Sequence, residues 1–384
     1  MGENRKKYRV VFWGTYDTGK PRTRIMLRGL KDNGIQVLEC HADVWGGIED
    51  KSQVFTWSDR LRLLVKWLSS YPKLILNYMK LPRHDIVIIG YIGQLDVLIL
   101  WPFAKLRGVP IVWDAFLSLY NTMVEDRKLI GLKHPLASLL FAWEWLTCRA
   151  ADLVVLDTAA HGQYFVDSFG LPPGKVGQVF VGAETDVFRP KITKQAKSAK
   201  NGVPLPFTAL FYGQFIPLHG IATIVRAVKL VEKEEIRWIL IGKGQESEKI
   251  SNLVNELRLS NLEWIEWVPY EDLLTWIHSA DVCLGIFGDT DKAKRVIPNK
   301  VFQILASGRP LITGDTPAVR ELLRPSDVIS LVPVGDAAVL ATAVRDMAAK
   351  KETLSRLRER LSEFVIGPKK VGKQLISEIE RILC

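Results

Sequence analysis

Short apolar runs that end at glycine or aspartate alternate with helical stretches, and this alternation constrains the fold more than any other feature of the sequence. Residues 8–13 form one such run, which Gly14 ends and a helix to Asp32 follows. The runs 85–91 and 110–113 enclose another helix. Strand, helix and strand joined by short links require parallel pairing. The sequence therefore predicts an α/β fold built on doubly wound parallel sheets.

The alternation occurs twice, on either side of a segment without apolar periodicity. Residues 191–206 are rich in Lys, Ala, Asn and Pro and are predicted to form a linker. With 384 residues, 48% of them hydrophobic, the chain has the length for two domains and enough apolar residues for a core in each. We expect a first domain over residues 1–190, a second over 207–368, and a terminal helix over 369–384.

Charge and cysteine usage narrow the functional class. The net charge of +10 favours polyanionic partners, but zinc-ligand spacings, stacking motifs and long basic helices are missing, so we expect no nucleic-acid partner. The four cysteines lie far apart and form no CxxC pair, which is typical of reduced thiols. Residues 1–7 are polar and basic without an apolar core, so no secretion signal is predicted. We expect a cytoplasmic protein without a membrane span.

Two helical stretches of the first half have a composition suited to a membrane surface. Residues 58–80 combine apolar positions with Arg and Lys, and Tyr71-Pro72 is expected to break that helix midway. Residues 136–150 are apolar and carry two tryptophans. The first can lie on an anionic membrane or be an ordinary helix with a solvated basic face, and the second can face a membrane or the core. Attachment to the inner face of the plasma membrane is thus one of two open interpretations.

Residues 296–312 contain the most informative functional pattern. They predict a loop, a helix that starts after Pro298, a stop at Gly308 and a short apolar strand. Such a helix presents free N–H groups and its positive dipole end at Asn299 and Lys300. Lys300 adds a full charge, so the pattern predicts a phosphate site. The alternative is an ordinary helix–strand unit with a lysine facing solvent.

The first half offers a second set of polar candidates at the ends of its predicted strands. The dinucleotide fingerprint GxGxxG is missing, which disfavours a nicotinamide-dependent oxidoreductase. The loop after Gly14 carries Arg22 and Arg24, which either meet phosphate or belong to a basic exposed loop. Asp114 directly follows the predicted strand 110–113 and is the best polar candidate beside a reacting group, with a helix cap or turn as the alternative.

Several segments resemble the family-4 retaining glycosyltransferases of the GT-B fold, the glycosyl transferases group 1. Gly308-Arg309-Pro310 matches the end of the family's donor-site helix, and residues 213–220, 242–246 and 183–190 are similar to further family segments. The resemblance implies two Rossmann-like domains that face each other across a cleft, with the terminal helix 369–384 packing back on the first domain. It implies catalytic roles for Asp114 and Lys300, with no metal. The expected donor-binding residues are Gly14, Arg22, Arg24, Gly213, Gln214, His219, Gly220, Gly242, Gly244, Val268, Arg295, Pro298, Asn299 and Gln303.

The chain departs from the family pattern at four of these positions. The two glutamates of the family's donor-site helix fall on Arg295 and Gln303. Gln303 can hydrogen-bond hydroxyl groups but cannot act as a carboxylate. Gln214 and His219 stand where the family has Arg and Lys, so Lys300 is expected to neutralise more of the donor's diphosphate.

The resemblance implies transfer of a hexose from a UDP- or GDP-sugar to a saccharide or lipid-linked acceptor, with retention at the anomeric carbon. The nucleotide sugar is then a substrate, and no cofactor is expected. Envelope polysaccharide or glycolipid synthesis is the expected setting, with the protein cytoplasmic or peripheral on the membrane. The alternative is a glycosyltransferase-like scaffold subunit that has lost activity together with the acidic pair.

Overall fold

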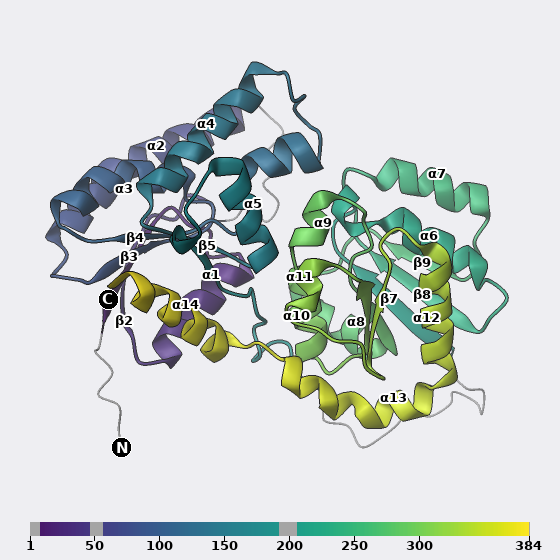
Figure 1. Ribbon diagram of the computed structural model, residues 1–384. Helices are drawn as coiled ribbons and strands as arrows, with labels where there is room; N and C mark the ends of the chain where they lie inside the picture. The colour runs from purple at the N-terminus through teal and green to yellow at the C-terminus, as the bar shows by residue number, and fades with distance from the viewer. Residues whose placement is uncertain (1–7, 47–56, 192–205, 384) are drawn as a thin grey trace, which may run out of the picture. The chain divides into compact units, whose positions relative to one another are not determined.

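The computed structural model describes residues 8–46, 57–191 and 206–383, which form two compact units (Figure 1). The first unit comprises residues 1–181 together with 367–384, and the second comprises 182–366. Residues 182–190, which were expected in the first domain, belong to the second unit, and residues 367–368, which were expected in the second domain, belong to the first unit. The predicted linker lies outside the described residues except for its two ends.

The first unit is built on a six-stranded parallel sheet in the order β2-β1-β3-β4-β5-β6. Its strands are β1 (Arg9–Gly14), β2 (Gln36–His41), β3 (Ile86–Ile89), β4 (Ile111–Asp114), β5 (Leu153–Leu156) and β6 (Val176–Gln178). The central strands β3, β4 and β5 are completely buried, because helices cover both faces of a parallel sheet. The helices are α1 (Pro21–Asp32), α2 (Trp57–Lys80), α3 (Gln94–Leu106), α4 (Pro135–Ala150), α5 (Ala159–Phe169) and α14 (Pro368–Leu383).

The helix α2 is continuous through Pro72, so the predicted break at Tyr71-Pro72 is wrong. The proline ring is exposed, whereas Tyr71 and Leu74 on either side of it are buried in the core of the unit. Proline removes one backbone hydrogen bond from a helix interior. Burial of its neighbours stabilises the helix on both sides of that gap.

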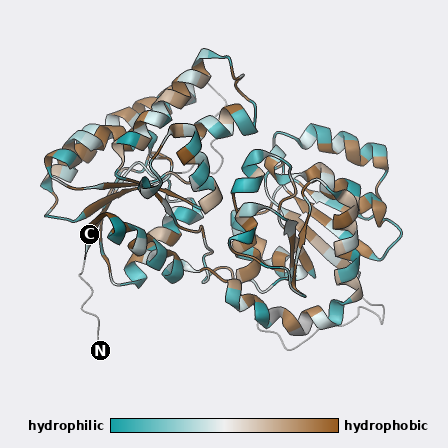
Figure 2. Cartoon of the chain, in the orientation of Figure 1, coloured by the Kyte–Doolittle hydropathy of each residue, from teal (hydrophilic) through white to brown (hydrophobic). Residues whose placement is uncertain are grey.

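The second unit repeats the architecture with the strand order β12-β11-β10-β7-β8-β9. Its strands are β7 (Phe207–Tyr212), β8 (Ile236–Ile241), β9 (Leu262–Ile265), β10 (Val282–Leu284), β11 (Leu311–Gly314) and β12 (Ile329–Val332). Its helices are α6 (Ile221–Leu230), α7 (Ser247–Leu257), α8 (Leu273–Ser279), α9 (Asp291–Arg295), α10 (Asn299–Ala306), α11 (Pro317–Arg320), α12 (Ala337–Ala349) and α13 (Lys351–Leu357). Apolar residues colour the strands of both sheets brown in Figure 2. Two doubly wound parallel sheets confirm the predicted fold class.

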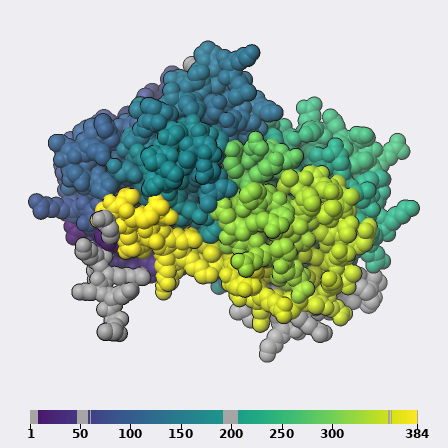
Figure 3. Space-filling model, in the orientation of Figure 1, coloured from purple at the N-terminus to yellow at the C-terminus, as the bar shows by residue number. Residues whose placement is uncertain are grey.

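The last helix, α14, lies against α1 of the first unit, and Figure 3 shows it on the surface of that unit. Two glycines permit this packing. A Cβ on Gly372 would lie 2.1 Å from the carbonyl oxygen of Gly29, so neither glycine can carry a side chain without separating the helices. In the part of the chain that the structure describes, no helix combines the length and hydropathy needed to cross a bilayer.

Candidate functional site

In the second unit, the ends of two neighbouring strands mark the place where the chain reverses its direction of winding. From β7 the chain passes through α6 to β8 on one side, whereas β10 leads to β11 on the other. Ligands of open α/β sheets bind at the carboxyl ends of strands at this switch point. The turn at Gly213, directly after β7, lies there, and it leads through a short helix at Pro217–His219 to α6.

Lys300 extends from α10 to this turn and is the most unusual side chain of the unit. It is only 5% exposed, and its Nζ has no hydrogen-bond partner. The Nζ lies 3.7 Å from the centroid of the Phe211 ring. Burial lowers the pKa of the Lys300 ammonium well below its usual value. A buried ammonium that contacts an aromatic ring and lacks a counterion is suited to receive an anion.

The helix that carries Lys300 begins without a side-chain cap. Pro298 occupies the cap position and offers no acceptor to the N–H groups of the first turn, where Asn299 and Lys300 stand. The predicted helix start after Pro298 is therefore confirmed. An anion at this end would interact with the helix dipole and with Lys300 together.

The glycines of this region make room for neighbouring backbone and for Lys300. Gly213 has a φ of 141°, and a Cβ there would lie 2.8 Å from Lys300 Nζ. A Cβ on Gly242 would lie 1.9 Å from the carbonyl oxygen of Gly213, and one on Gly244 would lie 2.7 Å from that of Phe215. The turn after β8 therefore packs on the turn after β7. Gly220 has a left-handed φ of 64° and caps α6.

His219 and Gln214 shape the same turn. The Nδ1 of His219 bonds the backbone carbonyl of Gln214, and because a carbonyl only accepts, Nδ1 carries the proton. The neutral ring therefore has an acceptor at Nε2, and His219 can donate to a phosphate from Nε2 only as the imidazolium. The side chain of Gln214 is exposed.

Gln303 is fixed in a chain of hydrogen bonds that the sequence did not reveal. Its Oε1 lies 3.2 Å from the Tyr212 hydroxyl, and its Nε2 donates to the Tyr270 hydroxyl at 3.4 Å. The Tyr270 hydroxyl in turn donates to Glu184 Oε2 at 3.0 Å. This chain of hydrogen bonds joins four residues that are far apart in sequence. It leaves Gln303 with one N–H and one lone pair for a ligand.

Two further expected donor residues lie on segments of the same unit. Arg295 is the last residue of α9 and is half-buried, and Val268 is half-buried shortly after β9. Neighbouring Lys294 is held by Asp289 at 3.0 Å, which reduces its availability for a phosphate.

In the first unit, the corresponding turn after β1 contacts the carboxylate of Asp96. A Cβ on Gly14 would lie 2.3 Å from Oδ2 of Asp96. The backbone N–H of Thr15 donates to Asp96 Oδ2 at 2.8 Å, and the Tyr71 hydroxyl donates to Oδ1 at 2.6 Å. Burial raises the pKa of Asp96 to about 6. Gly14 therefore accommodates this carboxylate, which occupies the place where a phosphate was expected.

Arg22, an expected donor-binding residue, and Asp114, an expected catalytic residue, form a salt bridge with each other. Arg22 Nε donates to Asp114 Oδ1 at 2.8 Å, Nη1 donates to the Val179 carbonyl at 3.1 Å, and both charged side chains are 1% exposed. Burial raises the pKa of the Asp114 carboxyl, and the Arg22 guanidinium opposes that rise. Arg22 is thus engaged within the unit instead of facing a phosphate. Arg24 is half-buried and donates to the Thr18 carbonyl at 3.1 Å.

A buried histidine lies close to this pair, beside Asp157. His161 is 1% exposed, and its Nδ1 lies 2.7 Å from Asp157 Oδ1. Asp157 follows β5 as Asp114 ends β4, so the two carboxylates lie at adjacent strand ends. The first unit therefore has a buried polar cluster of Arg22, Asp114, Asp157 and His161 at the carboxyl edge of its sheet.

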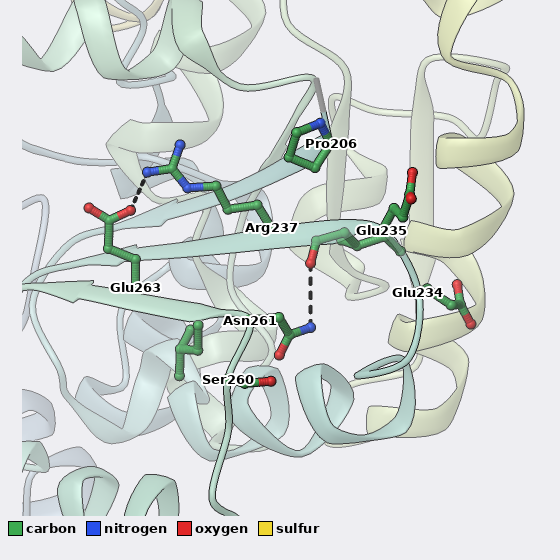
Figure 4. A pocket seen from close by; sticks show the side chains of 9 residues that line it. Pro206, Glu234, Glu235, Arg237, Ser260, Asn261 and Glu263 are labelled. Atoms are coloured by element: carbon green, nitrogen blue, oxygen red, sulfur yellow. Dashed lines mark hydrogen bonds and ion pairs between the residues drawn. The ribbon is translucent and has the colours of Figure 1, made fainter. Parts of the chain in front are cut away.

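A cavity of about 610 Å³ lies elsewhere in the second unit (Figure 4). Its lining includes Ile236 and Leu262, the first residues of β8 and β9, together with Glu234, Glu235 and Arg237. It therefore opens at the amino ends of the strands, opposite the turns described above. Because ligands of such sheets bind at the carboxyl ends, the Lys300 region is the better candidate site.

Sequence comparison relates the second unit to a known family. Residues 206–350 match the sequence model of the glycosyl transferases group 1. A D-inositol 3-phosphate glycosyltransferase of Thermomonospora curvata is 27% identical over 286 residues, 66% of this chain and 62% of the relative. A chitobiosyldiphosphodolichol beta-mannosyltransferase of Kluyveromyces lactis is 23% identical over 68% of this chain and 63% of its own length. The chain thus spans about three fifths of the length of these curated relatives.

Solved structures share the fold over almost the whole chain. A sucrose-phosphate synthase from Thermosynechococcus elongatus matches with a TM-score of 0.69 and 16% identity, covering 97% of this chain and 98% of the other. The Anabaena protein HepE, in complex with UDP, matches with a TM-score of 0.65 and 11% identity, covering 97% and 99%. These similarities confirm the predicted GT-B fold of two Rossmann-like domains.

Proposed function

We propose that this protein is a glycosyltransferase that moves a hexose from a nucleoside diphosphate sugar to a saccharide or lipid-linked acceptor, with retention at the anomeric carbon. The match of residues 206–350 to the glycosyl transferases group 1 supports the general class. The names of the curated relatives support a role in the synthesis of glycans or glycolipids. The nucleotide sugar is the donor substrate, and the proposal includes no resident cofactor.

The buried Lys300 ammonium is the single observation that carries the proposal. It lies beside the Gly213 turn at the switch point of the second unit, without a hydrogen-bond partner. The equivalent turn of the first unit is filled by the carboxylate of Asp96. A diphosphate would be repelled by that carboxylate and attracted by Lys300. The donor therefore binds in the second unit.

Charge stabilisation explains how this site would promote transfer. When the sugar leaves, negative charge grows on the diphosphate, and preorganised cations and N–H groups at that place lower the barrier. Lys300 and the uncapped first turn of α10 supply both. Protonated His219 adds a donor at Nε2, and the remaining N–H and lone pair of Gln303 are available to donor hydroxyl groups.

A calorimetric titration with UDP, GDP and ADP tests the donor site. We expect one of the three to bind, and Lys300→Ala to weaken it by about tenfold to a hundredfold, the worth of a hydrogen bond to a charged group. Lys249→Ala is the matched control, because Lys249 is exposed and paired with Glu246 at 3.0 Å. Equal affinity in the wild type and Lys300→Ala would overturn the assignment.

The titration also distinguishes an active glycosyltransferase from a non-catalytic scaffold subunit. A non-catalytic scaffold that has lost its donor site together with the acidic pair should bind none of the three nucleotides. If one binds, the corresponding nucleotide sugars can be screened for transfer. The anomeric proton of the product, observed by NMR, then reports whether the configuration is retained, and an inverted product would contradict that part of the proposal.

A further inference from the structure

The first unit exposes apolar side chains in one region. Among the residues that the structure describes, fourteen of the eighteen large apolar side chains that are exposed lie on α2, on α3 or within residues 129–146. Leu64 and Val65 on α2 are 45% and 59% exposed, Leu106 at the end of α3 is 78% exposed, and Leu139 on α4 is 63% exposed. The helix α3 contacts both α2 and α4. We call the solvent side of these three helices the apolar outer face.

The helix α4 buries a carboxylate and exposes leucines. Its buried residues are Ala137, Glu144, Thr147 and Cys148, whereas Leu139 and Leu146 face solvent. Glu144 accepts hydrogen bonds from the Ser118 hydroxyl at 2.5 Å and the Leu119 N–H at 2.9 Å. A surface helix ordinarily has the reverse pattern. Glu144 thus fixes α4 to the unit by hydrogen bonds together with the small buried residues, while Leu139 and Leu146 remain exposed.

The charges that accompany the exposed apolar residues are mainly positive. On α2, Lys66, Lys73 and Lys80 are exposed, and the acidic residue of that helix is Asp59. The loop before α4 adds exposed Lys128 and Lys133. At the far end of α4, Arg149 lies over the Trp145 ring at 3.6 Å, so a cation and a half-exposed indole occur together. Apolar area bordered by lysines and tryptophan is the composition of segments that lie in a membrane interface.

We propose that the apolar outer face docks on an anionic membrane surface. Positive charge among the apolar residues complements anionic lipid headgroups. The 24 residues of α2 give it a length of about 36 Å, which allows many shallow insertions along one plane. The exposed leucines are spread over α2, α3 and α4. Figure 2 shows apolar and polar colours alternating along α2 and α4. This docking does not depend on the donor site, and a nucleotide titration cannot substitute for its test.

Flotation with lipid vesicles tests the docking. The full chain is mixed with vesicles of equal parts phosphatidylglycerol and phosphatidylcholine, or of phosphatidylcholine alone, at low and high salt. We expect flotation with the anionic vesicles at low salt and a clear loss at high salt, because salt screens surface charge. Leu64→Glu with Leu139→Glu should reduce the bound fraction by about tenfold or more, since each change replaces an inserting leucine with an anion.

Two controls keep the result interpretable. Leu230→Glu changes a leucine of α6 that is 56% exposed in the second unit, and it should float like the wild type. Circular dichroism then checks that each variant is folded. Failure of the wild type to float with anionic vesicles at low salt would overturn the proposal. A second outcome would also overturn it. If the wild type forms a dimer and does not float, and Leu64→Glu with Leu139→Glu converts that dimer to a monomer, then the apolar outer face binds a second copy of the chain.

Discussion

The buried ammonium of Lys300 links stability and ligand binding at a single residue. Burial lowers its folded-state pKa, so the unfolded chain binds more protons between the folded and the unfolded pKa, and stability rises with pH across that range. Lys300→Met keeps a side chain of similar length without the charge. We expect it to raise the free energy of unfolding of the free protein at neutral pH by about 1–2 kcal/mol and to remove that rise with pH.

Denaturant unfolding of both proteins over a pH series measures this effect. Lys249→Met should change the stability by no more than about 0.5 kcal/mol, because that lysine is exposed. A clear loss of stability in Lys300→Met would mean that the ammonium stabilises the folded protein, against our interpretation.

The hydrogen bonds of Gln303 give a reason why this chain has glutamine where the family pattern has glutamate. Its Nε2 donates to the Tyr270 hydroxyl, whose own proton is directed to Glu184. A glutamate at position 303 would compete with Glu184 for that proton. We expect Gln303→Glu to cost about 1 kcal/mol of stability, and Glu184→Gln to recover part of that cost in the double variant. A double-mutant cycle by thermal unfolding checks this, and strictly additive effects would contradict the hydrogen-bond chain.

At the scale of elements, Asp96 connects the turn after β1 to α2 and α3. Its carboxylate accepts hydrogen bonds from Thr15 of that turn and from Tyr71 of α2. Its pKa rises from 3.8 to about 6 in the folded state, so the folded protein binds more protons between these values and loses stability as the pH rises through them. The shift corresponds to about 2–3 kcal/mol.

Asp96→Asn should remove that part of the pH dependence. An asparagine can accept from the Thr15 N–H with its oxygen and donate to the Tyr71 hydroxyl with its amide nitrogen. We therefore expect the variant to fold and to show a flatter stability profile between about pH 4 and pH 6 than the wild type. Equal slopes in chemical denaturation over that range would show that Asp96 does not titrate there.

Helices and strands could be predicted from the sequence where a local pattern of residues determines where they begin and end. The helix after Pro298 and the strand that follows Gly308 lie as expected, with α10 at Asn299–Ala306 and β11 at Leu311–Gly314. The function of Gly14 could not be predicted, because the carboxylate beside it comes from Asp96, which follows Thr15 by 81 residues. Arg22 and Asp114 are 92 residues apart, and nothing local in either segment indicates that they pair.

At the scale of the whole molecule, the chain returns to its first unit at its end. The helix α14 follows the entire second unit in sequence, yet it packs on α1. From the sequence, only the family resemblance predicted this crossing. The packing depends on two backbones in close contact at Gly29 and Gly372, which sequence periodicity does not reveal.

Gly372→Ala tests that contact. Alanine favours a helix over glycine by about 1 kcal/mol, so a surface site would gain stability. Here the added Cβ would meet the Gly29 carbonyl, a backbone atom that cannot rotate away, and we expect a net loss of about 1–3 kcal/mol. Lys373→Ala, at an exposed position of the same helix, is the control. Thermal unfolding decides, and a stabilised Gly372→Ala would contradict the close packing.

The contact between Lys300 and the donor's diphosphate can be tested by measuring the protons taken up when the nucleotide binds. The nucleotide that binds is titrated into the wild type and into Lys300→Met at several pH values below 10.5, each in two buffers with different heats of ionisation. A diphosphate that contacts Lys300 favours the ammonium and raises its pKa, so the wild type should take up protons on binding. Lys300→Met should bind more weakly and take up fewer protons. Equal affinity and equal proton uptake in the two proteins would show that the diphosphate does not contact Lys300.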